Sequence, residues 1–142
     1  MHFERGREYR RAIQYLQQAG ENAARHSAHQ EAIALLNKGL AVIETSPNTS
    51  ERAQQELPLH VALGGQLIIT KGYGAPEVKQ TYTRARKLCQ QVGEVPQQFP
   101  VLRGLWEVSI ERAELSAAQE CAEQMLHLAE RVQEPRLLVW SL

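Results

Sequence analysis

The stretch KGYGAP, residues 71–76, comes nearest in residue type to a phosphate-binding loop. It places Gly72 and Gly74 next to Lys71, and glycine-rich loops with a lysine can cradle phosphate groups. Such a loop follows a β-strand and carries a longer glycine pattern, whereas the residues before Lys71 have helical spacing. The stretch therefore favours a turn between two helices. Because the chain has no G-x-x-x-x-G-K-[ST] motif, we do not expect it to hydrolyse ATP by itself.

Histidines and cysteines are the other side chains with metal-binding or nucleophilic chemistry. His26 and His29 can share a face with Glu31 nearby, but a metal site needs three or four convergent ligands, and no HExxH or CxxC motif supports one. Cys89 and Cys121 fall on apolar helix faces, where a thiol acts as a small hydrophobe. A catalytic thiol would need a paired histidine, which chain spacing does not reveal. We expect no metal, no cofactor and no catalytic residue.

Two basic clusters, residues 5–11 and 84–87, present a different kind of candidate. Each is either a solvated helix face or a recognition surface for an acidic peptide or a neighbouring module. Within TYTRARK, residues 81–87, helical spacing predicts that Tyr82 lies in the core and that its charged neighbours face outward. The candidate interaction surface comprises Thr81, Arg84, Lys87, Arg103 and Glu107.

The composition excludes several classes of protein. The chain has 142 residues, 43% of them hydrophobic and 23% charged, which fits one globular domain. Basic and acidic residues number 16 each, and this balance argues against a general electrostatic grip on nucleic acid or on an anionic membrane. No apolar run approaches the ~20 residues of a membrane helix, and no signal sequence is present. We expect a cytoplasmic protein.

The apolar spacing predicts helices throughout. They cover residues 9–25, a second segment ending near 44, and then 51–71, 76–92, 97–112 and 114–132. Residues 2–6 resemble the tail of a helix whose body is missing, and residues 136–142 the start of a further helix. Ser27 is expected to cap the second helix, and Pro58 to kink the third or restart it near Leu57. The predicted inward positions also include Gly64, Ile110, Leu115 and Leu126.

The even-numbered helices repeat one pattern. A small or medium residue is followed by others four and seven positions later, with anchors 46 and then 40 residues apart. The repeat packing positions are Ala32, Leu36, Gly39, Val78, Tyr82, Ala85, Ala118, Ala122 and Met125. We expect Gly39 to let neighbouring helices approach closely. The pattern predicts an all-α, TPR-like α-solenoid of about three hairpins, at about 8–44, 50–93 and 97–133, with truncated helices at both ends and a further helix beginning at 135–142.

The resemblance extends beyond the generic repeat. The segments YLQQAGENAARHSAHQEAIALLNKGL, ERAQQEL, TKGYGAPEVKQTYTRARKLCQQVGE and FPVLRGLW resemble the TPR-like helical-repeat region of bacterial multidomain signalling ATPases. These proteins carry an AAA-type or STAND-type ATPase, often fused to a nucleotide cyclase or a DNA-binding domain. The resemblance implies a sensor or scaffold segment and transfers no catalytic residue.

The sequence therefore predicts a non-enzymatic protein–protein interaction or regulatory module, whose partner is a protein or peptide segment or a neighbouring domain. Nucleic acid and membrane are not expected partners. The alternative is a small-molecule sensor that regulates an attached ATPase or cyclase, with a closed pocket near Trp106 lined by Arg103 and Glu107. Because the chain ends on LLVW and begins with an isolated HF, it also predicts a homodimer formed through the terminal helices.

Overall fold

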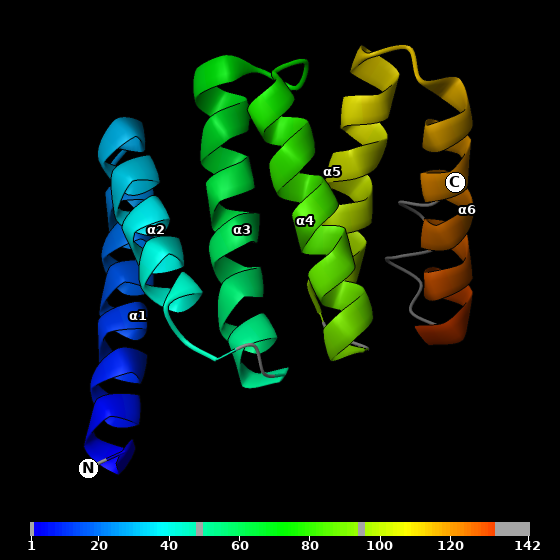
Figure 1. Ribbon diagram of the computed structural model, residues 1–142. Helices are drawn as coiled ribbons and strands as arrows, with labels where there is room; N and C mark the ends of the chain where they lie inside the picture. Colours follow the sequence, from blue (N-terminus) through cyan, green and yellow to red (C-terminus); the bar gives the residue numbers. More distant parts are fainter. Residues whose placement is uncertain (1, 48–49, 94–95, 133–142) are drawn as a thin grey trace.

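The computed structural model describes residues 2–47, 50–93 and 96–132, which form helices and turns without a β-strand. The helices are α1 (His2–Arg25), α2 (His29–Glu44), α3 (Ser50–Lys71), α4 (Pro76–Val92), α5 (Gln98–Glu111) and α6 (Leu115–Val132) (Figure 1). The all-α prediction is confirmed for these residues. None of their helices is both long enough and apolar enough to cross a membrane.

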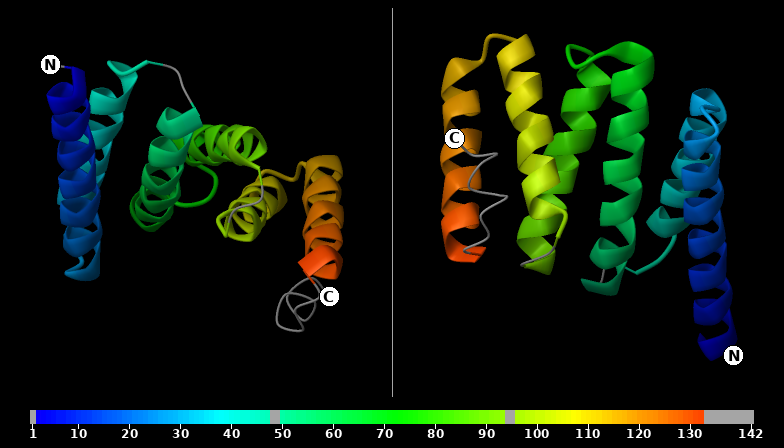
Figure 2. Two further views of the ribbon diagram at one scale, coloured as in Figure 1. Left: turned by 90° about the horizontal axis from the view of Figure 1, so that it is seen from below. Right: turned by 180° about the vertical axis from the view of Figure 1, so that it is seen from behind.

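The six described helices lie side by side in chain order, and connections at alternating ends make neighbours antiparallel (Figures 1 and 2). Each helix packs against the next one in the sequence, and α1 also contacts α3. One cluster of buried apolar side chains extends from Ile13 on α1 to Cys121 on α6. Each inner helix therefore has packing partners on two sides.

The repeat packing positions lie in this core. All of them are buried except Ala122, which is half-buried. A Cβ atom on Gly39 would lie 3.2 Å from Leu59 Cδ1 on α3 and 3.5 Å from Leu16 Cβ on α1. Gly39 thus sits where α2 approaches its neighbours on both sides, and this close packing offsets the cost of glycine within a helix, roughly 1 kcal/mol.

Tyr82 on α4 is held between two glycines of the flanking helices. A Cβ atom on Gly104 of α5 would lie 2.4 Å from Tyr82 Cε1, and one on Gly64 of α3 would lie 2.8 Å from Cε2. These atoms belong to opposite edges of the ring, so the ring cannot move away from one glycine without approaching the other. The two glycines therefore make room for the one aromatic residue at a repeat packing position.

Two of the helix–helix turns share one geometry. Ser27 after α1 and Ala113 after α5 both have positive φ, 60° and 56°. In each turn the next residue donates its backbone N–H to a carbonyl five positions earlier, Ala28 to Ala23 and Glu114 to Ser109, both at 2.8 Å. The predicted Ser27 cap is wrong, because Ala28 occupies the N-cap position of α2 and no side chain caps that helix.

Two helix boundaries differ from the sequence prediction. Residues 2–6 are not a separate fragment, because α1 is continuous from His2 to Arg25. Its two internal glycines, Gly6 and Gly20, cost only about 1 kcal/mol each, too little to break a long helix. Helix α3 passes through Pro58 without restarting at Leu57. Leu57 and Leu59 on either side of the proline are 2% and 0% exposed, and their burial offsets the lost backbone hydrogen bond.

Three predicted inward positions are exposed instead. They are Ile110 (45%), Leu115 (70%) and Leu126 (38%). On α5 the buried stripe runs through Val101, Leu105 and Val108. Ile110 follows Val108 by two residues, which rotates it about 200° around the helix axis and away from that stripe. The predicted further helix at 135–142 lies outside the described residues, so dimerisation through it stays a prediction.

Candidate functional site

The five residues of the predicted interaction surface do not behave alike. Thr81 is buried rather than outward-facing, and its hydroxyl donates to the Glu77 carbonyl at 2.8 Å. It lies one residue from Tyr82 on a helix that packs on both sides, which widens the buried face. Lys87 and Arg103 are exposed and Glu107 is half-buried. Arg84 forms an ion pair described below.

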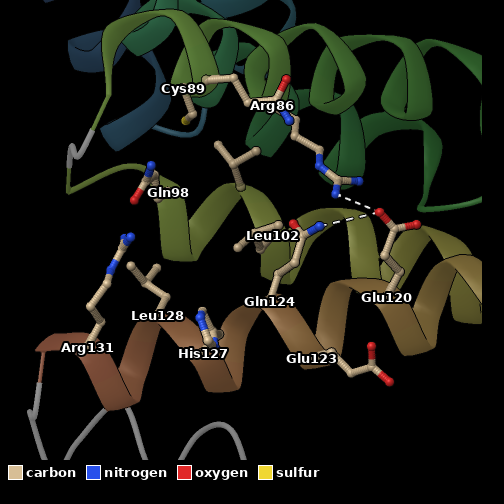
Figure 3. Close-up of a pocket in the computed structure, with 12 residues that line it drawn as sticks. Arg86, Cys89, Gln98, Leu102, Glu120, Glu123, Gln124, His127, Leu128 and Arg131 are labelled. Atoms are coloured by element: carbon tan, nitrogen blue, oxygen red, sulfur yellow. Dashed lines mark hydrogen bonds and ion pairs between the residues drawn. The ribbon is translucent and has the colours of Figure 1, made fainter.

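A groove between α4 and α6, with α5 as its floor, has a volume of about 420 Å³ (Figure 3). We call it the α4–α6 groove. Its lining consists of Arg86, Cys89 and Gln90 from α4, Gln98, Val101 and Leu102 from α5, and Glu120, Glu123, Gln124, His127, Leu128 and Arg131 from α6. Aliphatic side chains cover the floor, and polar side chains form the rim.

An ion pair between α4 and α6 crosses the groove. Arg86 Nη2 on α4 donates to Glu120 Oε1 on α6 at 3.1 Å, and Gln124 Nε2 donates to the same oxygen at 3.3 Å (Figure 3). At the other end, Gln98 Nε2 donates to the Gly93 carbonyl at 3.0 Å. The Glu120 charge is therefore compensated, and the bottom of the groove is apolar.

The groove does not assemble a thiol–imidazole pair. Figure 3 places Cys89 on α4 and His127 on α6, on opposite sides of the groove. The described residues include no hydrogen bond between the two side chains. Burial raises the pKa of the Cys89 thiol, so the thiolate that a nucleophile requires is disfavoured. Within the described residues, no three His, Cys, Asp or Glu side chains gather to hold a metal ion.

A second hollow, of about 390 Å³, lies between α2 and α4 above α3. We call it the α2–α4 hollow. Asn37, Leu40, Ala41 and Glu44 line it from α2, Glu56 and His60 from α3, and Arg84 from α4. Arg84 Nε and Nη2 donate to the two Glu56 carboxylate oxygens at 2.9 and 3.1 Å, and His60 Nε2 lies 3.0 Å from Glu56 Oε1. Arg84 is thus a link between α3 and α4.

The pKa values in this cluster follow from burial and pairing. The Glu56 side chain is 10% exposed. Burial raises its pKa, but the hydrogen bonds and charges of Arg84 and His60 outweigh burial, and the net pKa is lowered. Burial lowers the pKa of His60 despite its contact with Glu56, and its Nδ1 atom is buried without a hydrogen-bond partner among the described residues. His60 is therefore neutral and Glu56 ionised at pH 7.

The hollow and the groove occupy equivalent places along the chain. Each lies between two successive even-numbered helices, above the odd-numbered helix that joins them. The 40-residue spacing between Val78 and Ala118 also separates Arg84, which lines the hollow, from Gln124, which lines the groove. The residues that line one hollow therefore have counterparts of different chemistry in the other.

Sequence patterns did not identify most of these lining residues. Glu56 and His60 stand four positions apart on a helix, which places them on one face, but their spacing carries no signal for Arg84 on another helix. Arg103 and Glu107 line neither the groove nor the hollow. Comparison with known protein families, curated proteins and solved structures finds no match to this chain.

Proposed function

We propose that this chain is a TPR-like helical-repeat module that binds a segment of another protein, and that it performs no catalysis itself. Antiparallel helices packed in chain order, small residues at repeated contact positions, and the matching turns at Ser27 and Ala113 support the repeat architecture. The sequence resemblance further suggests a regulatory segment of a bacterial signalling ATPase, which works in the cytoplasm.

The observation that carries the binding proposal is the pair of equivalent hollows. Both open between successive even-numbered helices, so α2, α4 and α6 supply one face with two neighbouring recesses. Helical-repeat proteins bind extended partners because each repeat adds a strip to one continuous surface. A partner segment that crosses this face can place one side chain in each recess.

Selection from a random peptide library tests the proposal. Gln124→Trp places a bulky side chain at the α4–α6 groove, whereas Gln119→Trp makes the same change at an exposed position on α6 that does not line it. We expect selected peptides to bind the original protein and Gln119→Trp alike and to bind Gln124→Trp at least tenfold more weakly. Peptides that bind all three proteins equally would place binding elsewhere.

A small-molecule sensor remains the second candidate. The groove volume of about 420 Å³ falls in the range of ligand pockets, roughly 300–1,000 Å³. This pocket lies between α4 and α6 and does not include Arg103 or Glu107. A fragment screen read by thermal shift, repeated on Gln124→Trp and Gln119→Trp, distinguishes a ligand of the groove from a surface binder.

A further inference from the structure

The α2–α4 hollow has an excess of negative charge. Arg84 compensates Glu56 through two hydrogen bonds, and His60 is neutral at pH 7. Glu44 also lines the hollow, is exposed, and forms no hydrogen bond or ion pair with the described residues. The three ionised groups that line the hollow from α2, α3 and α4 therefore sum to one uncompensated negative charge.

The end of α2 adds to this charge. Leu40, Ala41 and Glu44 belong to the last turns of the helix, and the aligned peptide dipoles give its C-terminus a partial negative charge, although Thr45 and Ser46 donate hydrogen bonds to the Val42 and Ile43 carbonyls. Helices often place a lysine or arginine in the last turn to offset this charge, and α2 has none there. The helix terminus and the Glu44 carboxylate thus favour the same ligand, a cation.

The α4–α6 groove has the opposite character at its centre. Its floor contains Val101 and Leu102, which are 1% and 8% exposed, and the uncharged Cys89 thiol lines the side formed by α4. Arg86 already compensates Glu120 on the rim. An aliphatic side chain fits such a floor because it removes apolar surface from water without burying an unpaired charge.

We propose that the bound segment places a lysine or arginine side chain in the α2–α4 hollow and an aliphatic side chain in the α4–α6 groove. This inference rests on the proposed segment-binding function and names the chemistry of the partner. Packed helices lie 8–10 Å apart, so recesses one hairpin apart are separated by about 10–20 Å, which roughly three to six extended residues span.

Two labelled peptides test the inference by fluorescence polarisation. One carries lysine and leucine separated by four serines, and the other has glutamate in place of the lysine. We expect the lysine peptide to bind about fivefold more tightly, which is the affinity ratio that corresponds to an exposed charge pair of about 1 kcal/mol. Glu44→Lys reverses this preference. Glu31→Lys makes the same charge change on α2 outside the hollow and leaves the preference intact.

The outcomes separate this inference from the proposed function. Library-selected peptides that lose affinity for Gln124→Trp but contain no basic residue, or that bind Glu44→Lys and Glu31→Lys equally, overturn the inference while the binding function stands. Equal binding of the lysine and glutamate peptides overturns it as well. Selected peptides that combine a basic and an aliphatic residue, and whose affinity depends on Glu44, support it.

Discussion

Substitution of Gly104 by alanine tests the packing around Tyr82 most directly. The new methyl group would lie 2.4 Å from Tyr82 Cε1, 2.7 Å from Cζ and 2.8 Å from Cδ1. Carbon atoms in favourable contact are about 3.5–4 Å apart, so either the ring or a helix has to move by roughly 1 Å. The ring has no room, because a Cβ atom on Gly64 would already lie 2.8 Å from its opposite edge.

Two opposing terms set the magnitude. Replacing glycine by alanine inside a helix favours folding by about 1 kcal/mol, and overpacking a filled core costs typically 1–3 kcal/mol. Because the overlap at Gly104 is severe, we expect a net loss of about 1–2 kcal/mol in the free energy of unfolding. For a chain of this size the melting temperature falls by roughly 3–10 °C.

The matched control is Gly65→Ala, at the residue that follows Gly64 on α3. A Cβ atom on Gly65 would have no neighbour within 4 Å, so Gly65→Ala gains helix propensity without a clash and raises the melting temperature. Urea unfolding followed by circular dichroism measures both variants. In a Tyr82→Leu background Gly104→Ala costs less than about 0.5 kcal/mol, since the ring it would strike is gone. A Gly104→Ala protein as stable as Gly65→Ala would refute the reasoning.

Three further predictions concern other contacts. Gly39→Leu lowers the free energy of unfolding, measured by urea unfolding, by roughly 1–3 kcal/mol. Gly39→Ala has a smaller effect, because only the flexible end of the Leu59 side chain has to move. Arg84→Met leaves the buried Glu56 carboxylate with His60 as its one remaining partner and lowers the free energy of unfolding by about 1–3 kcal/mol. The control Arg10→Met removes the exposed pair with Glu51 and lowers it by at most about 1 kcal/mol. The lowered pKa values of His60 and Glu56 mean that the folded state binds fewer protons than the unfolded one, so stability falls as pH drops below about 6.5 for His60 and below about 4.5 for Glu56. Between pH 8 and pH 5 the melting temperature therefore falls less for His60→Gln than for the original protein. An equal fall in the two proteins would contradict the assignment of this pH dependence to His60.

The helices were predictable because each inner face leaves a periodic trace in the chain. Ala32 and Leu36, four positions apart, are both fully buried, as their spacing predicts. Periodicity identifies the centre of a buried face but not its width. Helix α4 packs on α3 and on α5, so its buried face is wide enough to include Thr81, which a single apolar stripe would place outside.

The polar cluster was not predictable for a different reason. Glu56 and Arg84 are 28 residues apart on separate helices, and their pairing depends on how α3 and α4 are rotated about their axes. That rotation is set by close contacts such as the one between Gly64 and Tyr82. The spacing of glycines and tyrosines in the sequence does not show which of them will pack together. The helix rotation that brings Arg84 to Glu56 therefore cannot be predicted from a sequence motif.

The packing positions and the recess positions are different residues of the same even-numbered helices, so the residue type at one set can change without changing the other. At the first packing position the even-numbered helices carry Ala32, Val78 and Ala118, which are all small or medium apolar residues. At recess positions the chemistry changes between repeats, from Arg84 to Gln124 and, across the 46-residue spacing, from Glu44 to Gln90. A packing position must fit its neighbours in every hairpin, whereas Glu44 is exposed and forms no hydrogen bond or ion pair with the described residues, so packing does not constrain it. The charge of Glu44 is therefore a property of one recess, and we expect Glu44→Lys to alter the choice of partner segment while leaving α2 at least as stable as before, because a last-turn lysine offsets the helix dipole.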